Sequence, residues 1–142
     1  MMRAILTTLA AALFCAACGD DSVTSPSTDT TTTRSTEYFR ANLEVRGSQF
    51  YSFTVSTSGT TDVTLLSLRP AGASTPALTT AVGLGVGTPA GTGCALTVAT
   101  TVQPALSTQL RTTTTPTIYC VNIADIGNLQ NTVDFTIRIV HP

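Results

Sequence analysis

The sequence predicts an all-β fold, an antiparallel β-sandwich of the jelly-roll type with about seven or eight strands, over residues 37–142. Three observations indicate this fold. Apolar residues recur at every second position in one segment after another, which is the period of a half-buried strand. Short groups of Gly, Pro, Ser, Asp and Asn separate these segments. No segment shows the roughly 3.6-residue period of an amphipathic helix.

The first four expected strands fall between residues 39 and 86. Strand 39–45 alternates apolar and polar residues and ends at a turn containing Gly47. Strand 51–55 alternates in the same way and ends at Gly59. Strand 63–68 is apolar almost throughout, as in a strand buried on both faces. In strand 78–86, glycines at 83 and 85, followed by Gly87, occupy one face and allow a bulge or the close approach of a neighbouring chain.

The last four expected strands follow a Gly-rich loop over residues 87–93. Their apolar residues alternate over 94–98, 119–123 and 133–139, and more weakly over 106–111. The loop 125–131 separates the last two. Seven or eight such strands joined by turns are about the number that one sandwich of this length holds.

The N-terminus predicts an export signal over residues 1–17. A basic residue, Arg3, precedes a short apolar stretch that ends in small residues, and this stretch is shorter than the roughly 20 residues that cross a bilayer. Residues 14–19 resemble the lipobox of bacterial lipoproteins, in which Cys18 is the lipid-attachment residue; Cys15 departs from the usual leucine. Two alternatives are cleavage after Ala17 without lipid, which gives a secreted protein, and a buried helix.

Residues 18–36 are expected to form the lipid-attachment cysteine and a disordered tether. The segment is rich in Thr and Ser, and Val23 is its one large apolar residue, so it cannot bury enough surface to fold. Acyl chains on Cys18 would hold the protein on a membrane. We therefore expect an exported protein, lipid-anchored in the bacterial cell envelope (at the outer membrane in a Gram-negative cell), or alternatively secreted or periplasmic.

The expected domain contains two cysteines, Cys94 and Cys120, and an even pair in an exported domain predicts one disulfide. Tyr119, Val121 and Ile123 form the apolar set of their strand, so Cys120 is expected on the opposite, outer face of its sheet. The alternative turns Cys120 inward, as in an immunoglobulin-like bridge between sheets.

Residues 47–55, 119–123 and 135–139 together resemble the bacterial pre-peptidase C-terminal domain (PPC domain). The resemblance spans about residues 37–142. It implies a small β-sandwich of the kind attached to secreted bacterial proteins, many of them proteases. The acidic motif usual in the middle strands of that family is missing here, so the calcium binding of some members does not carry over.

Composition and the distribution of functional residues exclude several roles. Charged residues make up 11% of the chain, the net charge is -1, and the seven basic residues are all Arg and scattered singly, which speaks against nucleic-acid binding. Catalysis by a histidine would depend on His141, where fraying of the chain end is expected. We therefore expect no enzyme activity and no cofactor.

One acidic and amide-rich loop is the only candidate metal site. Asp125, Asn128 and Asn131 bring oxygen atoms of the kind that calcium takes, although Asp, Gly and Asn are also common in plain turns, so no metal is expected. The predicted function is that of a non-catalytic envelope lipoprotein presenting a binding or structural module to an envelope protein or glycan. An accessory lipoprotein subunit of an envelope complex is the alternative, and an accessory domain of a secreted hydrolase a remote one.

Overall fold

The computed structural model describes residues 33–74 and 76–142; the predicted signal peptide, Cys18 and most of the predicted tether lie outside them. The described residues form eight strands and no helix, so they contain no helix that could cross a membrane. The strands are β1 (Ser35–Leu43), β2 (Ser48–Val55), β3 (Gly59–Pro70), β4 (Val82–Ala90), β5 (Gly93–Val102), β6 (Leu110–Thr114), β7 (Thr117–Ala124) and β8 (Val133–His141).

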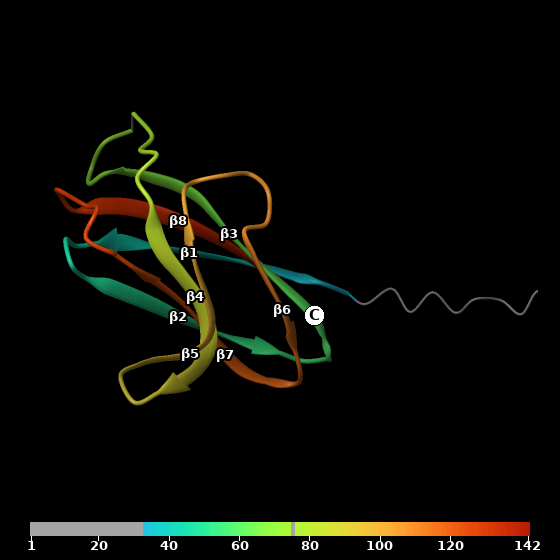
Figure 1. The fold of residues 1–142 in the computed structure, drawn as a ribbon. Helices are drawn as coiled ribbons and strands as arrows, with labels where there is room; N and C mark the ends of the chain where they lie inside the picture. Colours follow the sequence, from blue (N-terminus) through green and yellow to red (C-terminus); the bar gives the residue numbers. More distant parts are fainter. Residues whose placement is uncertain (1–32, 75) are drawn as a thin grey trace, which may run out of the picture. The chain divides into compact units, whose positions relative to one another are not determined.

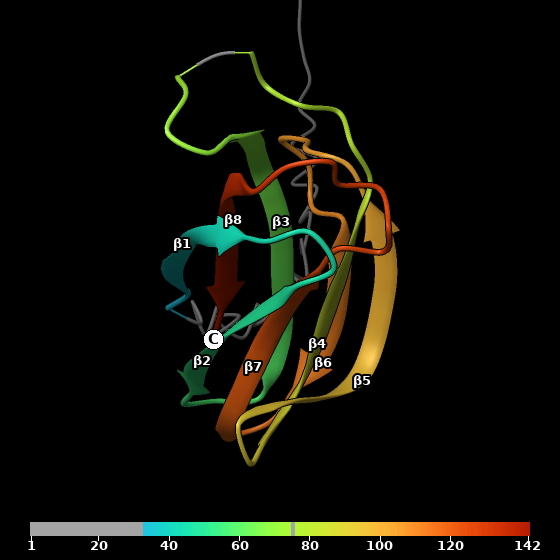
Figure 2. The same cartoon turned by 90° about the vertical axis from the view of Figure 1, so that its left-hand side faces the viewer.

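The strands form two antiparallel sheets of four, which confirms the predicted sandwich (Figures 1 and 2). Sheet A has the order β1-β8-β3-β6, and sheet B has the order β2-β7-β4-β5. Strand β1 therefore pairs with β8, β2 with β7, β3 with β6 and β4 with β5. This is the pairing of one long hairpin rolled up on itself, which is the jelly roll.

The core lies between the two sheets and is made mostly by the alternating apolar residues that the sequence singles out; Val45 and Leu96 of that set are exposed, because β1 ends at Leu43 and the register of β5 shifts next to Leu96. Strand β8 alternates between buried and half-buried residues over its whole length. Each inward face places its side chains against the other, and these side chains interdigitate. The fully buried side chains of the core include Leu43, Leu65, Leu68, Leu84, Ile123, Ile137 and Ile139.

Several strand boundaries differ from the predicted ones. Strand β1 begins at Ser35, before the expected boundary at residue 37, because Ser35 and Thr36 already pair with His141 and Val140 of β8. Just before the strand, Arg34 donates hydrogen bonds to the carbonyls of Thr60 and Val140 at 2.9 and 3.0 Å. Strand β4 begins at Val82 instead of residue 78, although the Leu78 N–H still donates to the Leu68 carbonyl at 2.8 Å.

The Gly-rich loop and the sixth strand also differ from their predictions. Strands β4 and β5 extend through most of residues 87–93 and leave only 91–92 as the turn, where Gly91 has a φ of 56°. The sixth strand is 110–114 instead of 106–111. The prediction took Leu106 for a core residue, but its side chain is 84% exposed. The buried residues of this strand are Leu110 and Thr114.

The two ends of the sandwich differ in the length of their connections. Ser35 pairs with His141, Gly59 with Thr114 and Val55 with Thr117, so these residues share one end, the Ser35 end. Of the connections between the eight described strands, the short ones over 56–58, 91–92 and 115–116 lie there. We call the opposite end the loop end. It holds the connections 44–47, 71–81 and 125–132, and the connection 103–109 starts there. Long loops are where binding residues concentrate, so the loop end is the place to look for a site.

Candidate functional site

The Asp125 carboxylate organises the loop end. Its Oδ1 accepts hydrogen bonds from the backbone N–H groups of Gly127, Asn128 and Leu129 at 2.9, 2.9 and 3.1 Å. Its Oδ2 accepts one from the Arg46 N–H at 2.8 Å. These bonds, that from Arg46 foremost, lower the pKa of Asp125 below its ordinary value. One ionised side chain thus joins the loops 44–47 and 125–132.

The structure divides the three residues that the sequence suggests for a metal. Both Asp125 oxygens accept backbone N–H groups, whereas Asn128 and Asn131 line a separate pocket. The Asn128 side-chain amide donates to the Ala81 carbonyl at 3.0 Å. Within residues 33–74 and 76–142, no three His, Cys, Asp or Glu side chains are grouped so that they could hold a metal ion.

A pocket of about 330 Å³ opens at the loop end between the loops 71–81 and 125–132. Three hydrogen bonds fix its walls: the Leu78 N–H to the Leu68 carbonyl, the Ala71 N–H to the Thr132 carbonyl at 3.1 Å, and the Asn128 amide to the Ala81 carbonyl. The lining residues are Pro70, Leu78, Thr80, Asn128, Leu129, Gln130, Asn131, Thr132 and Val133. Its volume lies at the lower end of the roughly 300–1,000 Å³ of small-molecule sites.

The chemistry of the pocket is uncharged. Amide side chains of Asn128, Gln130 and Asn131 and hydroxyls of two threonines stand beside apolar side chains, and no acidic or basic residue contributes. Amides both donate and accept hydrogen bonds, and hydroxyls do the same. The pocket therefore suits a small neutral group that carries donors and acceptors over a partly apolar surface.

A second polar cluster lies at the Ser35 end and corrects an expectation about the chain end. His141 is not frayed: it belongs to β8, is 3% exposed, and its Nε2 lies 2.9 Å from the Glu37 carboxylate. Glu37 also accepts the Tyr51 hydroxyl at 2.5 Å. That hydrogen bond, together with burial and the charge of Glu37, raises the pKa of Tyr51. Among the described residues, no Ser or Cys hydrogen-bonds to His141, and the cluster of Tyr51, Glu37 and His141 joins β2, β1 and β8.

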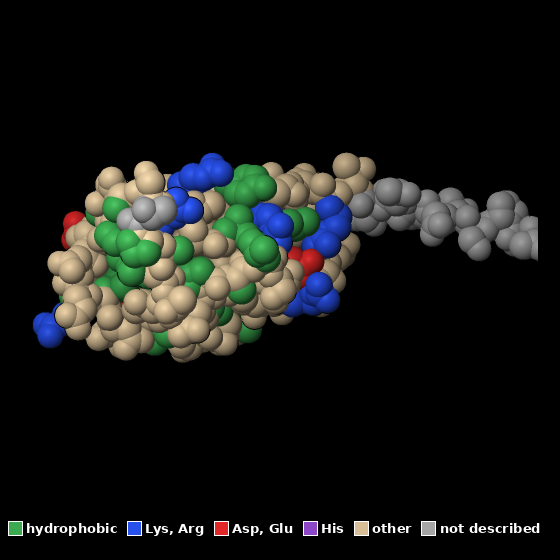
Figure 3. Space-filling view, turned by 90° about the horizontal axis from the view of Figure 1, so that it is seen from above, with side chains coloured by type: hydrophobic (Ala, Val, Ile, Leu, Met, Phe, Trp, Pro, Cys, Tyr) green, Lys and Arg blue, Asp and Glu red, His purple; other side chains and the backbone are tan. Residues whose placement is uncertain are grey.

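An ion-pair cluster also lies towards the Ser35 end. Asp62, whose side chain is 9% exposed, contacts Arg34 at 2.9 Å and Arg111 at 2.5 Å. Burial alone raises the pKa of Asp62, but the hydrogen bonds from Arg111 and Arg34 outweigh it and hold that pKa below its ordinary value. The space-filling view from the side of β3 and β8 shows basic side chains grouped around an acidic one (Figure 3).

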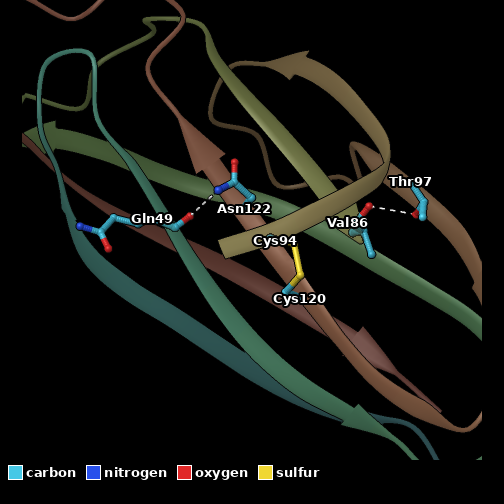
Figure 4. Close-up of a disulfide and its surroundings, with 6 residues drawn as sticks. All are labelled: Gln49, Val86, Cys94, Thr97, Cys120 and Asn122. Atoms are coloured by element: carbon cyan, nitrogen blue, oxygen red, sulfur yellow. Dashed lines mark hydrogen bonds between the residues drawn. A yellow bond between two sulfur atoms is a disulfide. The ribbon is translucent and has the colours of Figure 1, made fainter. Parts of the chain in front are cut away.

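The predicted disulfide between Cys94 and Cys120 is confirmed, with the two Cα atoms 5.9 Å apart (Figure 4). The predicted orientation of β7 is also right. Val121 and Ile123 are fully buried, whereas Ile118 is 53% exposed, so Cys120 leaves the sheet on its outer face. The disulfide joins two strands of sheet B and does not connect the two sheets.

The burial of Cys120 on that outer face was not foreseen from the sequence. Cys94 lies on β5 and Cys120 on β7, with β4 between them, and strands two places apart in a flat sheet are roughly 9.5 Å apart. The register of β4 and β5 shifts between Val86 and Gly87, and the end of the β4–β5 hairpin folds over β7. The hairpin covers Cys120, which is 0% exposed.

No protein-family model matches this sequence, and no curated protein matches it.

Proposed function

We infer that this protein is a non-catalytic lipoprotein of the bacterial cell envelope that presents a jelly-roll binding module on an N-terminal tether. One observation carries the proposal. The chain enters the domain at Ser35, and the long loops and the uncharged pocket lie at the opposite end of the strands. A domain held at Ser35 therefore turns its binding loops away from the point of attachment.

The attachment itself rests on Cys18. Small residues precede it and a polar segment follows it, as in lipoproteins. Metabolic labelling with a palmitate analogue should mark the wild-type chain and not the Cys18→Ser variant. Equal labelling of the two would contradict lipid attachment and would favour cleavage after Ala17 and release as a secreted protein.

A neutral glycan is the ligand that the pocket favours. A volume of about 330 Å³ holds one small ring or side chain, not the face of a folded protein, and the amide and hydroxyl lining matches the hydroxyls of an uncharged sugar. Hydrogen-bonding groups fix the orientation of such a ligand while the apolar residues exclude water.

Binding to immobilised neutral glycans tests this proposal. Gln130 lines the pocket, and Gln103 is a second exposed amide from another loop that leaves the loop end. Loss of one ligand hydrogen bond of about 1 kcal/mol weakens binding roughly fivefold, so Gln130→Ala should bind about fivefold more weakly and Gln103→Ala like the wild type. Equal effects of the two variants, or no binding to any neutral glycan, would exclude this ligand class.

A further inference from the structure

The charged residues of the domain are divided unequally between the two sheets. None of the strands of sheet B, which are β2, β7, β4 and β5, contains an Asp, Glu, Lys, Arg or His. Every strand of sheet A contains at least one, and the view from the β3 and β8 side shows such side chains at the surface (Figure 3). These residues are Glu37, Arg40, Asp62, Arg69, Arg111, Asp134, Arg138 and His141.

The outer face of sheet B is also partly apolar. Phe50, Leu96 and Ile118 are 38%, 45% and 53% exposed. Phe50 lies opposite Asn122, and Ile118 lies opposite Thr54, so polar and apolar side chains alternate across this face. The Leu96 side chain lies over Gly85, where a Cβ would be 2.8 Å from it. Surfaces that combine exposed apolar side chains with a lack of charge are typical of contacts between proteins.

The face is held in one shape by its own contacts. The Cys94–Cys120 disulfide fastens the folded end of the β4–β5 hairpin to β7. The Thr97 hydroxyl donates to the Val86 carbonyl at 3.1 Å at the bulge, and the Asn122 amide donates to the Gln49 carbonyl at 3.2 Å (Figure 4). A partner therefore meets a preformed surface, and binding does not have to order it.

We propose that the outer face of sheet B is an interface with a second copy of this chain. A two-fold interface sets one patch against the same patch, so any net charge on it would repel itself, and this patch has none. Phe50 and Ile118 are separated along β2 and β7 and offer apolar contacts at both ends of such a patch. The face also runs along the strands, with Ser35 at one end, so two copies attached to one membrane can meet side by side; only this last point rests on the proposed function.

The size of the face predicts a weak dimer. The sheet has four strands. At a spacing of about 4.8 Å and a rise of about 3.3 Å over roughly eight residues, they cover about 500 Å² per copy, or about 1,000 Å² in total. Specific, stable interfaces bury about 1,200–2,000 Å², so this one is smaller and falls in the size range of weak, transient contacts. Because no charges face each other, the association should change little with salt.

Photo-crosslinking of the full chain in cells tests the proposal. The photoreactive amino acid p-benzoylphenylalanine replaces either Phe50 or Tyr38, two exposed aromatic residues on opposite sheets, and two copies with different tags are expressed together. Phe50 should give a product of twice the mass that carries both tags, and Tyr38 should not. Adding Ile118→Asp should reduce that product about tenfold or more, and Leu106→Asp, the same change at an exposed site outside sheet B, should leave it unchanged.

Each other outcome counts against the second copy. A Phe50 product with a different protein would favour the accessory-subunit alternative, and attachment to lipid alone would indicate a membrane contact. A product that survives Ile118→Asp, or that Leu106→Asp also removes, would overturn the assignment of this face. Ser52→Arg, at an exposed position on β2, repeats the test if Ile118→Asp fails to fold, as judged by the loss of the Cys94–Cys120 bond.

Discussion

At Gly87 the backbone of β5 occupies the place where a side chain would begin, and alanine there should destabilise the domain. A Cβ built on Gly87 would lie 1.9 Å from the Ala95 carbonyl oxygen and 2.7 Å from the Leu96 Cα. Both are backbone atoms, so no side chain can rotate out of the way. The new methyl group would have to push β5 away from β4 at the point where the register shifts.

The expected cost follows from the nature of this contact. Adding a methyl group to a packed site costs about 1–3 kcal/mol. We expect about 3 kcal/mol for Gly87→Ala, because β5 is also held by the bond from Cys94 to Cys120 and cannot move freely. Gly93→Ala is the matched control in the same hairpin, since its Cβ would come no nearer than 3.9 Å to the Ala90 oxygen. It should change the free energy of unfolding by less than about 1 kcal/mol, in the stabilising direction if at all.

Unfolding of the two oxidised variants by urea, followed by circular dichroism, measures this difference. In thermal unfolding, about 3 kcal/mol corresponds to a fall in Tm of roughly 12 °C for a domain of this size. Gly87→Ala should therefore unfold well before Gly93→Ala, with a similar dependence on urea concentration. If the free energies of unfolding of the two variants agreed within about 0.5 kcal/mol, the close approach of β5 at Gly87 would be refuted.

Three further predictions concern the disulfide and the two acidic sites. Replacing Cys94 and Cys120 by serine opens a loop with a sequence separation of 26. Urea unfolding should then give a free energy of unfolding lower by about 3.5 kcal/mol. An unchanged urea midpoint would show that the disulfide does not stabilise the fold. Because the pKa of Asp62 is lowered in the folded protein, its carboxylate stabilises the fold fully above the unfolded pKa of about 3.9, and this stabilisation is lost as pH falls through the folded pKa. The Asp62→Asn variant should therefore lose less stability than the wild type over that pH range. Parallel curves of unfolding free energy against pH for the two proteins would contradict this prediction. Millimolar calcium should leave the Tm of the protein unchanged, because both Asp125 oxygens already accept backbone N–H groups. A rise in Tm with calcium would show that the loop 125–131 binds the ion after all.

The strand content and the orientation of β7 could be predicted because period-two patterns are local. In β8, apolar residues at 133, 135, 137 and 139 are all buried, as the alternation requires. The same reasoning placed Cys120 on the outer face of its sheet, where the structure has it. The pattern failed at Leu106. Because this exposed leucine was counted as a core residue, the sixth strand was predicted at 106–111 instead of 110–114.

The contacts that build the site depend on residues far apart in the sequence, which a local pattern does not reveal. The buried His141 contacts Glu37, 104 residues away in the sequence. The pocket exists because the loop 71–81 returns beside β3 and bonds to residues of the loop 125–132. The glycines at 83, 85 and 87 predicted a bulge or a close approach, and both occur at Gly87, but only the structure shows that the hairpin then folds over Cys120.

The direction in which the module faces follows from the order of its loop lengths. In a rolled hairpin each strand runs opposite to the strand before it, so successive connections lie at alternate ends. The connections 44–47, 71–81, 103–109 and 125–132 alternate with the shorter 56–58, 91–92 and 115–116. Because the chain enters at the end that holds the short connections, the long loops lie at the opposite end of the strands from Ser35. Lengthening a short connection such as 91–92 should therefore leave ligand binding at the loop end unchanged, whereas shortening the loop 71–81, which contributes Leu78 and Thr80 to the pocket, should abolish it.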